Sequence, residues 1–443
     1  MIKKGSLTGL LLFGMFFGAG NLIFPPQLGL ESGQNFWPAI GGFVLSGVGI
    51  AILTLIIGTL NPKGYIDEIS KKIAPWFAVV YLVALYLAIG PFFAIPRTAT
   101  TAFSVGIEPM LPAGSHAIWL FGFTLVYFAF AYLIALNPSK ILDSIGRYLT
   151  PIFALLIVVL VVLGAAKYGS TAPQGATAEY AASAFGAGFL QGYNTLDALA
   201  SVAFSVVAVT TLNQLGFKNK KEYISTIWIV GILVALGFSV LYIGLAFLGN
   251  HFPLNLANLP KGANVGASVL SSATQAIFGP MAQIFLAIMV TVTCFTTTAG
   301  LIVSTGEFFH NTFSKVSYKV YATIFTLVGF AIANLGLNAI IQYSVPALEI
   351  LYPITIAIVM IVMVNRFLPL SKPGMQLTIA VVTLIAFASI LGRQFKLTAI
   401  LNLVNALPFA QASLPWLLPA LVGILLSLLL PNKQKSEAFE FEA

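Results

Sequence analysis

The sequence predicts an all-α polytopic membrane protein with about twelve transmembrane helices. Of its 443 residues, 59% are hydrophobic and 8% are charged, whereas about 25% of the residues in an ordinary soluble domain are charged. The apolar stretches are continuous and approach the roughly 20 residues that a spanning helix needs. Strands of a membrane barrel would instead show alternating segments of about ten residues. No stretch remains for a sizeable soluble domain, so we expect one transmembrane domain over residues 1–443.

Twelve apolar segments follow one another along the chain, and we expect each to cross the membrane once. They lie near residues 6–30, 36–60, 75–105, 116–136, 144–166, 183–212, 223–249, 279–305, 318–335, 344–366, 376–392 and 413–430. The first ten are interpreted as two halves, about 6–166 and 183–366. The last two are additional helices over about 376–430, and a short solvated tail follows at 431–443. The apolar start lacks the small-residue cleavage site of a signal peptide, and we interpret it as a retained first helix.

The basic residues between the segments predict the orientation of the chain. Sixteen Lys and Arg residues fall on the side of the amino terminus and five on the opposite side. Because basic loops stay in the cytoplasm, we expect both termini to be cytoplasmic. This topology accounts for the net charge of +8 without a nucleic-acid partner, and nothing indicates an obligatory protein partner. The single cysteine, Cys294, excludes a disulfide framework.

The first segment contains the stretch FFGAGNLIFPPQLG, residues Phe16 to Gly29, which predicts an interrupted helix. A proline alone would indicate only a kink, but here glycines, Asn21 and the pair Pro25-Pro26 fall within a few residues of one another. In a bilayer a broken helix is tolerated only beside protein or a hydrated cavity. Its free N–H groups suit a carboxylate and its free carbonyl groups suit a cation.

The sixth segment is interrupted in a similar way, by glycines followed by Tyr193, Asn194 and Thr195. The predicted breaks therefore fall in the first helix of each half. In transporters that are built from inverted repeats, such a pair of breaks marks the substrate site.

Asp197, Arg97 and Glu349 lie well inside apolar segments, where a charge costs about 2.5 to 3.5 kcal/mol. Asp197 is either an inward carboxylate near a cation or a substrate amine, or a structural acid bonded to backbone that the break leaves free. Arg97 either snorkels to the outer interface or belongs to a gate. Glu349, between Pro346 and Pro353, suggests a second gating element or a structural role.

The eighth segment carries a polar stripe, because Thr293, Thr297, Gly300, Ser304 and Glu307 recur at helical spacing. Hydroxyl oxygens combined with helix-end carbonyls form a hard-oxygen site that suits Na⁺. Alternatively, these hydroxyls hold helices together, at about 0.6 kcal/mol each. No hydrolytic motif is present, and we expect no enzyme.

Five motifs together resemble the bacterial branched-chain amino acid:cation symporters, a family that is similar in turn to transporters of the LeuT-type five-plus-five inverted-repeat fold. The motifs are FGAGNLIFPPQLG, GPFFAIPRTATTAF, GYNTLDALASVAF, CFTTTAGL and ALEILYP. The resemblance covers the whole chain. It implies that helices one and six are discontinuous and hold the amino acid between their breaks.

The resemblance also implies site residues. The substrate set is Ala19, Gly20, Asn21, Gly192, Tyr193, Asn194 and Thr195, with the substrate carboxylate at the amides around Ala19 to Asn21. The cation set comprises the carbonyls of Gly14, Phe17 and Thr293 and the hydroxyls of Thr296 and Thr297. Asn21 also corresponds to a ligand of a second cation site, which the sequence leaves open.

The function we expect is Na⁺-coupled import of leucine, isoleucine and valine across the bacterial inner membrane, with no cofactor besides the co-transported Na⁺. Two alternatives stay open: a proton-coupled transporter of other neutral amino acids, and a passive channel. A membrane-bound receptor is less consistent with the sequence, because no segment is left for a soluble output domain.

Overall fold

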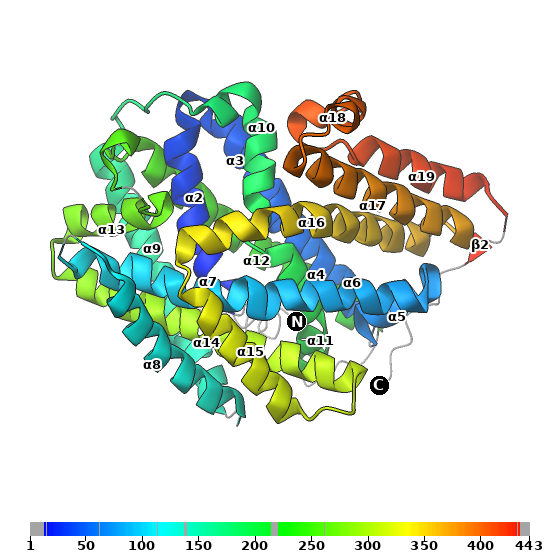
Figure 1. The fold of residues 1–443 in the computed structure, drawn as a ribbon, viewed down its shortest axis with the longest axis horizontal. Helices are drawn as coiled ribbons and strands as arrows, with labels where there is room; N and C mark the ends of the chain where they lie inside the picture. The colour runs from blue at the N-terminus through cyan, green and yellow to red at the C-terminus, as the bar shows by residue number, and fades with distance from the viewer. Residues whose placement is uncertain are drawn as a thin grey trace.

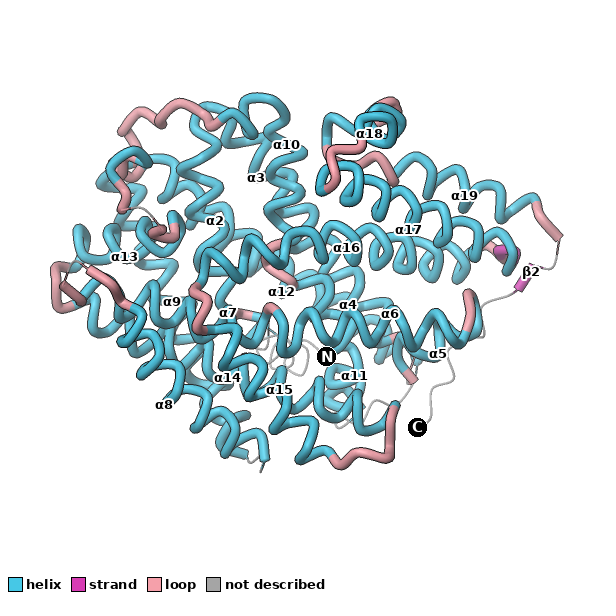
Figure 2. Tube along the Cα trace, in the orientation of Figure 1, coloured by secondary structure: helices cyan, strands magenta, loops and turns pink. Residues whose placement is uncertain are grey.

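A computed structural model describes residues 13–14, 16–61, 63–112, 114–136, 140–213, 220–260, 262–431 and 433–434. The start of the first predicted segment and nearly all of the predicted tail 431–443 lie outside these residues, as do both predicted cytoplasmic termini. Most of the described chain is helical, with short loops between the helices (Figure 2).

The α-helices of the described chain follow the predicted segments, except that α5, α13 and α18 lie in the connections between segments. They are α2 (Ala19–Ser32), α3 (Phe36–Val44), α4 (Ala51–Thr59), α5 (Gly64–Lys72), α6 (Pro75–Leu87), α7 (Ala94–Ala102), α8 (Ala117–Leu136), α9 (Lys140–Tyr168), α10 (Ala178–Tyr193), α11 (Asp197–Asn213), α12 (Lys220–His251), α13 (Val265–Phe278), α14 (Ala282–Thr312), α15 (Tyr318–Ala333), α16 (Leu337–Phe367), α17 (Lys372–Gln394), α18 (Thr398–Asn405) and α19 (Leu417–Leu429). Three π-helical turns continue the longer runs, η2 (Leu45–Ile50), η3 (Ala88–Phe92) and η4 (Phe103–Ile107). Single 3₁₀ turns are η1 (Gly33–Asn35), η5 (Glu108–Met110), η6 (Leu256–Asn258) and η7 (Ala410–Ala412).

The prediction of an all-α polytopic membrane protein is confirmed. Within the described residues, seven helical runs are long and apolar enough to span a membrane, and four shorter apolar helices accompany them. The first run, Ala19–Thr59, has 41 residues and would measure about 60 Å as one straight helix. Because the hydrocarbon core is about 30 Å thick, the turn at Gly33–Asn35 must divide this run into two passes.

Helix α13 was not among the twelve predicted segments. Its 14 residues are too few for the 20-residue threshold of a spanning helix, and the sequence placed them in the connection between the seventh and eighth segments. In the structure α13 packs against α2. Gly266 lies so close to the carbonyl of Ile23 that a side chain there would overlap it. This contact fixes one side of α2.

Both predicted breaks are present. Phe17 and Gly18 are not helical, and α2 begins at Ala19 after the extended backbone of Gly18. α10 and α11 are separated by Asn194 to Leu196, and Leu196 has a left-handed φ of 66°, which strains a residue with a Cβ. In α2, however, the helix passes through both prolines without interruption.

The last helices form a separate layer. Figure 1 shows α17, α18 and α19 together at one side of the molecule, where α17 packs on α16. Two short antiparallel strands, β1 (Leu370–Ser371) and β2 (Lys433–Gln434), pair Leu370 with Gln434.

We call the side of the bundle at α5 the α5 face and the side at α13 the α13 face.

Candidate functional site

The two breaks meet in the middle of the molecule. A Cβ placed on Gly20 would lie 3.1 Å from the Cα of Thr195 and 3.2 Å from its carbonyl oxygen. The first turn of α2 therefore touches the backbone that joins α10 to α11. Close approach of this kind needs glycine, because any side chain at this position would press against Thr195.

A cavity of about 40 Å³ lies at this junction, and we call it the central cavity. It is lined by Phe16, Gly18, Ala19, Gly20, Asn21, Ile89, Ala94, Arg97, Thr98, Thr195, Leu196, Asp197, Ala200, Phe204, Thr297 and Leu301. The volume holds about three water molecules, which is fewer than the non-hydrogen atoms of leucine. The helices around the cavity must therefore separate to admit an amino acid.

Much of the wall of the central cavity is apolar. Phe16 and Phe204 meet edge to face with their ring centroids 5.3 Å apart, and Ile89 and Leu301 are likewise buried in the lining. Such a surface favours an aliphatic group over a charged one, because burial of a methylene is worth about 0.8 kcal/mol.

A polar network ties the two breaks together. The Asn21 side chain accepts a hydrogen bond from the Gly18 N–H at 3.3 Å, and its amide donates to Asp197 Oδ2 at 3.1 Å. Tyr242 of α12 also donates to Asp197 Oδ2, at 2.6 Å, and Asn21 contacts the Tyr242 hydroxyl as well. Asn21 therefore caps the start of α2 and at the same time orients a buried carboxylate on α11.

Arg97 also lines the central cavity, and only 3% of it is exposed. It does not snorkel to an interface. Its Nη2 donates to the carbonyl of Thr195 at 3.4 Å, while Nε and Nη1 have no partner among the described residues. The guanidinium carbon lies 5.3 Å from the ring centroid of Phe24.

The threonine cluster of α14 lies beside the first break. A Cβ on Gly18 would be 3.4 Å from Thr297 Cγ2 and 3.6 Å from Thr297 Oγ1. The carbonyl of Thr293 accepts hydrogen bonds from Thr296 at 2.9 Å and from Thr297 at 3.2 Å. The Thr293 hydroxyl is buried without a partner in the described chain. Phe17 is fully buried and precedes the break directly. Gly14, one turn earlier, is half-buried.

Three residues of the predicted substrate set do not line the central cavity. Gly192 packs against η2 and α3, where a Cβ would lie 2.9 Å from the Phe43 carbonyl oxygen. Asn194 bonds through its amide to Gln191 at 3.0 Å. Tyr193 turns to a separate space, so Ala19, Gly20, Asn21 and Thr195 are the members of the set that the structure brings together.

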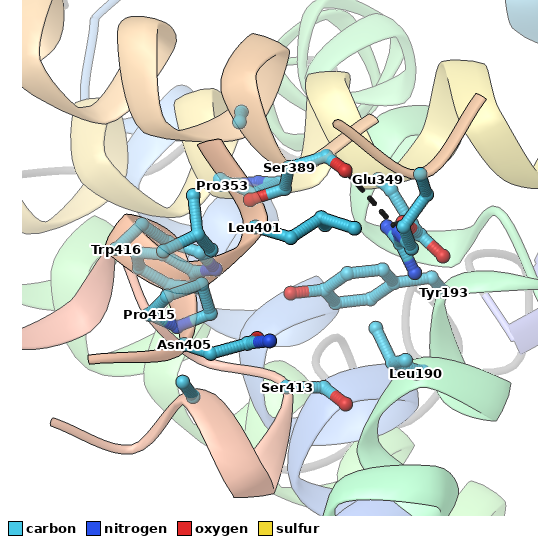
Figure 3. A pocket seen from close by; sticks show the side chains of 14 residues that line it. Leu190, Tyr193, Glu349, Pro353, Ser389, Leu401, Asn405, Ser413, Pro415 and Trp416 are labelled. Atoms are coloured by element: carbon cyan, nitrogen blue, oxygen red, sulfur yellow. Dashed lines mark hydrogen bonds and ion pairs between the residues drawn. The ribbon is translucent and has the colours of Figure 1, made fainter. Parts of the chain in front are cut away.

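That separate space is a cavity of about 120 Å³ between α10, α16, α17 and α18, and we call it the outer cavity. Figure 3 shows the Tyr193 ring extending into it, and that ring stacks on Tyr352 with centroids 4.1 Å apart. Glu349 lines the same cavity and forms an ion pair with Arg393 of α17. Glu349 therefore lines the outer cavity and not the central cavity.

A third cavity of about 210 Å³ opens at the α13 face, between the ends of α7, α8 and α16. His116 there makes a hydrogen bond to the Pro112 carbonyl at 2.9 Å and another to Glu108 at 3.2 Å. The Pro112 carbonyl, and then Glu108, raise the pKa of His116 above its usual value.

Sequence reasoning missed several residues of the site. Tyr242, which donates to Asp197, lies within a 32-residue apolar helix, where neither a break nor a polar stripe marks it. Phe204 and Leu301 line the central cavity but are ordinary apolar residues of their segments. Only the tertiary fold shows where these three side chains lie.

The comparisons with known proteins agree with one another. The family model described as branched-chain amino acid transport protein matches residues 1–434. A protein of Staphylococcus haemolyticus that is named as a branched-chain amino acid carrier is 40% identical over 433 residues, which cover 96% of either chain. A protein of Staphylococcus aureus strain USA300 with the same kind of name is 38% identical over 449 residues, which cover 100% of either chain.

Two solved structures share the fold at low sequence identity. Mhp1, a nucleobase-cation-symport-1 family transporter in a closed conformation with bromovinylhydantoin bound, matches with a TM-score of 0.59 and 14% identity, covering 98% of this chain and 94% of its own. MhsT in complex with L-phenylalanine matches with a TM-score of 0.57 and 18% identity, covering 95% and 97%. Both have the LeuT-type fold, and the fold of this chain is of that type.

Proposed function

The chain belongs to the family of branched-chain amino acid transport proteins, a family of transporters and not of enzymes, and from that premise we propose that it imports leucine, isoleucine and valine together with Na⁺. Transport would follow alternating access, in which the central cavity opens first to one face and then to the other. Substrate and ion are cargo, and the proposal requires no resident cofactor.

One observation carries this proposal: two interrupted helices meet at a cavity that is apolar on one side and polar on the other. The first N–H groups of α2 have no partner within the helix, and they suit the carboxylate of an amino acid. The aliphatic side chain of the substrate would lie against Phe16, Phe204 and Leu301. Because such a wall distinguishes one methylene by only about 1 to 3 kcal/mol, the three branched side chains should compete with one another.

The Na⁺ site that we propose lies between the first break and α14. The carbonyls of Gly14, Phe17 and Thr293 and the hydroxyls of Thr296 and Thr297 supply neutral, hard oxygens, which suit an alkali cation better than a transition metal. Support comes from the contact of Thr297 with Gly18 and from the position of Phe17 directly before the first break. The donor set is chemically suited to Na⁺.

A single Na⁺ supplies enough energy for accumulation. A membrane potential of about 100 mV contributes about 2.3 kcal/mol per charge, and a tenfold Na⁺ gradient adds about 1.4 kcal/mol. Together they support an accumulation of several hundredfold. We place the protein in the bacterial inner membrane with the α5 face toward the cytoplasm, on the basis of the distribution of basic residues along the sequence.

The test is uptake of labelled leucine by proteoliposomes that contain the purified protein. A Na⁺ gradient, a proton gradient or neither is imposed, with the membrane potential clamped to the same value in each case. We expect accumulation with the Na⁺ gradient, inhibition by unlabelled isoleucine and valine, and no inhibition by lysine or glutamate.

The other outcomes separate the alternatives. Accumulation driven by protons alone would move the coupling role from the threonine hydroxyls to a carboxyl group, with Asp197 or Glu349 as candidates. Equilibration without accumulation under any gradient would indicate a passive channel. Accumulation of other neutral amino acids but not of leucine would contradict the proposed substrate.

A further inference from the structure

Arg97 is in an unusual position for a charged side chain. It lies in the middle of a membrane-embedded bundle and is 97% buried, since only 3% of it is exposed. One of its nitrogens, Nη2, reaches a carbonyl oxygen, that of Thr195, at the long distance of 3.4 Å. The hydrogens on Nε and Nη1 have no acceptor among the described residues. Burial of a charge with unpaired donors is costly, so a binding partner is expected.

The guanidinium of Arg97 lies at the junction of the two breaks. Arg97 lines the central cavity, and its Nη2 would lie 3.3 Å from a Cβ at Gly20, in the first turn of α2. Asp197 lines the same cavity and carries the opposite charge. The Asp197 carboxylate is held by Tyr242 and Asn21, so Arg97 keeps its own donors available.

A cation and an anion in one small cavity with apolar walls match the charges of a zwitterion. A carboxylate needs hydrogen-bond donors and a positive charge, which a guanidinium supplies with several N–H groups in one plane. An ammonium group needs acceptors and a negative charge, which Asp197 supplies. The zwitterion of a branched-chain amino acid has both groups on one carbon, beside an aliphatic side chain.

We propose that the guanidinium of Arg97 binds the carboxylate of the transported amino acid and acts as a fixed cation at the junction of the breaks. This inference rests on the proposed function, because it assigns the substrate to the central cavity. Arg97 would bind the carboxylate together with the first N–H groups of α2 and would contribute to specificity. Asp197 would then face the ammonium group of the substrate.

A fixed cation at this place also bears on the second cation site that the sequence leaves open. The oxygen groups available to a second ion there include the Thr195 carbonyl and the Asn21 side chain. Arg97 already donates to the first, and a Na⁺ beside a guanidinium in a low dielectric is repelled. Uptake of leucine should therefore depend on Na⁺ with a Hill coefficient of about one.

The experiment compares ligands that differ only in the carboxylate. The melting temperature of the purified protein in detergent with Na⁺ is measured as a function of leucine and of leucinamide, which has the same side chain and amine but no carboxylate. Ligand affinity follows from the concentration dependence of the stabilisation. For the wild-type protein we expect leucine to bind at least tenfold more tightly than leucinamide.

Two variants assign that preference to Arg97. Arg97→Gln should weaken leucine binding by roughly 10- to 150-fold and lower the leucine-to-leucinamide ratio severalfold, while Arg97→Lys should recover part of the ratio. Arg393→Gln removes an arginine from the outer cavity and serves as the matched control, with the wild-type ratio. A purely structural role of Arg97 would lower the melting temperature of both Arg97 variants without changing the ratio.

Two results would overturn the proposal. One is that leucinamide binds the wild-type protein as tightly as leucine does, and the other is that Arg97→Gln keeps the wild-type ratio of leucine affinity to leucinamide affinity. A Hill coefficient of about two for Na⁺ in wild-type uptake would refute the fixed-cation role. If the wild-type protein neither binds nor transports leucine, the proposed function itself fails; if it does both and the ratio is independent of Arg97, only this inference fails.

Discussion

Replacement of Thr297 by valine tests the proposed Na⁺ site at its contact with the first break. Valine has nearly the same shape as threonine and keeps a methyl group at the position of Cγ2, which lies against Gly18. The change therefore removes one oxygen of the five proposed ligands and little else. The hydroxyl also donates to the Thr293 carbonyl at 3.2 Å, and that bond is worth about 1 kcal/mol of stability.

The expected effect is on Na⁺ and not on leucine. A hydrogen-bonding oxygen that faces a charge contributes about 1.5 to 3 kcal/mol, so Thr297→Val should raise the Na⁺ concentration for half-maximal uptake by roughly 10- to 150-fold. Leucine affinity at saturating Na⁺ should stay within about threefold of wild type, a change below 1 kcal/mol. The assay is leucine uptake by proteoliposomes over a series of Na⁺ concentrations.

Thr305→Val is the matched control, because Thr305 is a fully buried threonine of the same helix. Its hydroxyl has no partner among the described residues, and it packs against Gly90 two turns away from the cation set. An unchanged Na⁺ half-saturation in Thr297→Val would remove this hydroxyl from the site. Equal shifts in both variants would show a general effect on α14, and the reasoning would again fail.

Three further changes test the packing of α2 and the roles of the outer cavity. Gly266→Ala places a methyl group on the α2 backbone and should destabilise the protein by about 1 to 3 kcal/mol, seen as a lower melting temperature, while Gly122→Ala, with open space around it, should not. Glu349→Gln breaks the ion pair with the half-exposed Arg393, so uptake should keep its wild-type Na⁺ half-saturation; a large shift would place Glu349 in the coupling machinery. Tyr193→Phe removes a hydroxyl that does not line the central cavity and should leave leucine affinity within twofold, whereas a tenfold loss would return this residue to the substrate site.

The course of the chain could be predicted because hydrophobic length is nearly sufficient to identify spanning helices in a bilayer. All twelve predicted segments overlap helices of the structure. Helix α13 could not be found in this way, because it has only 14 residues and packs against α2. Its place depends on glycine contacts such as that of Gly266 with Ile23, between residues that are far apart in sequence.

The site could be predicted only in part, because breaks are local features and contacts are not. Gly18, Thr195 and Thr297 belong to motifs with a signal of their own, and they lie at the central cavity. The hydrogen bond between Asn21 and Asp197 joins residues 176 positions apart, and no spacing indicates it. Gly192 and Tyr193 are close to the second break in sequence, and a substrate contact was therefore expected for both. In the structure α10 directs Gly192 toward α3 and η2, and Tyr193 toward Tyr352 and the outer cavity.

The hydrogen bonds around the central cavity divide its walls into two groups. Asn21, Asp197 and Tyr242 tie α2, α11 and α12 together through short bonds. On the other side, the hydroxyl of Thr298 in α14 forms hydrogen bonds with Thr98 of α7 at 2.5 Å and with Tyr127 of α8 at 2.7 Å.

In the described chain, Arg97 of α7 donates to the Thr195 carbonyl and so connects the two groups of helices. At 3.4 Å this hydrogen bond is longer than the bonds named above within each group. The contact of Gly18 with Thr297 also crosses, through van der Waals packing alone. The cavity can therefore enlarge most easily by separation of the two groups along this boundary. The proposed Na⁺ and carboxylate positions both lie on it, so cargo that binds there would join the two groups directly, and the free energy of binding would favour the closed arrangement.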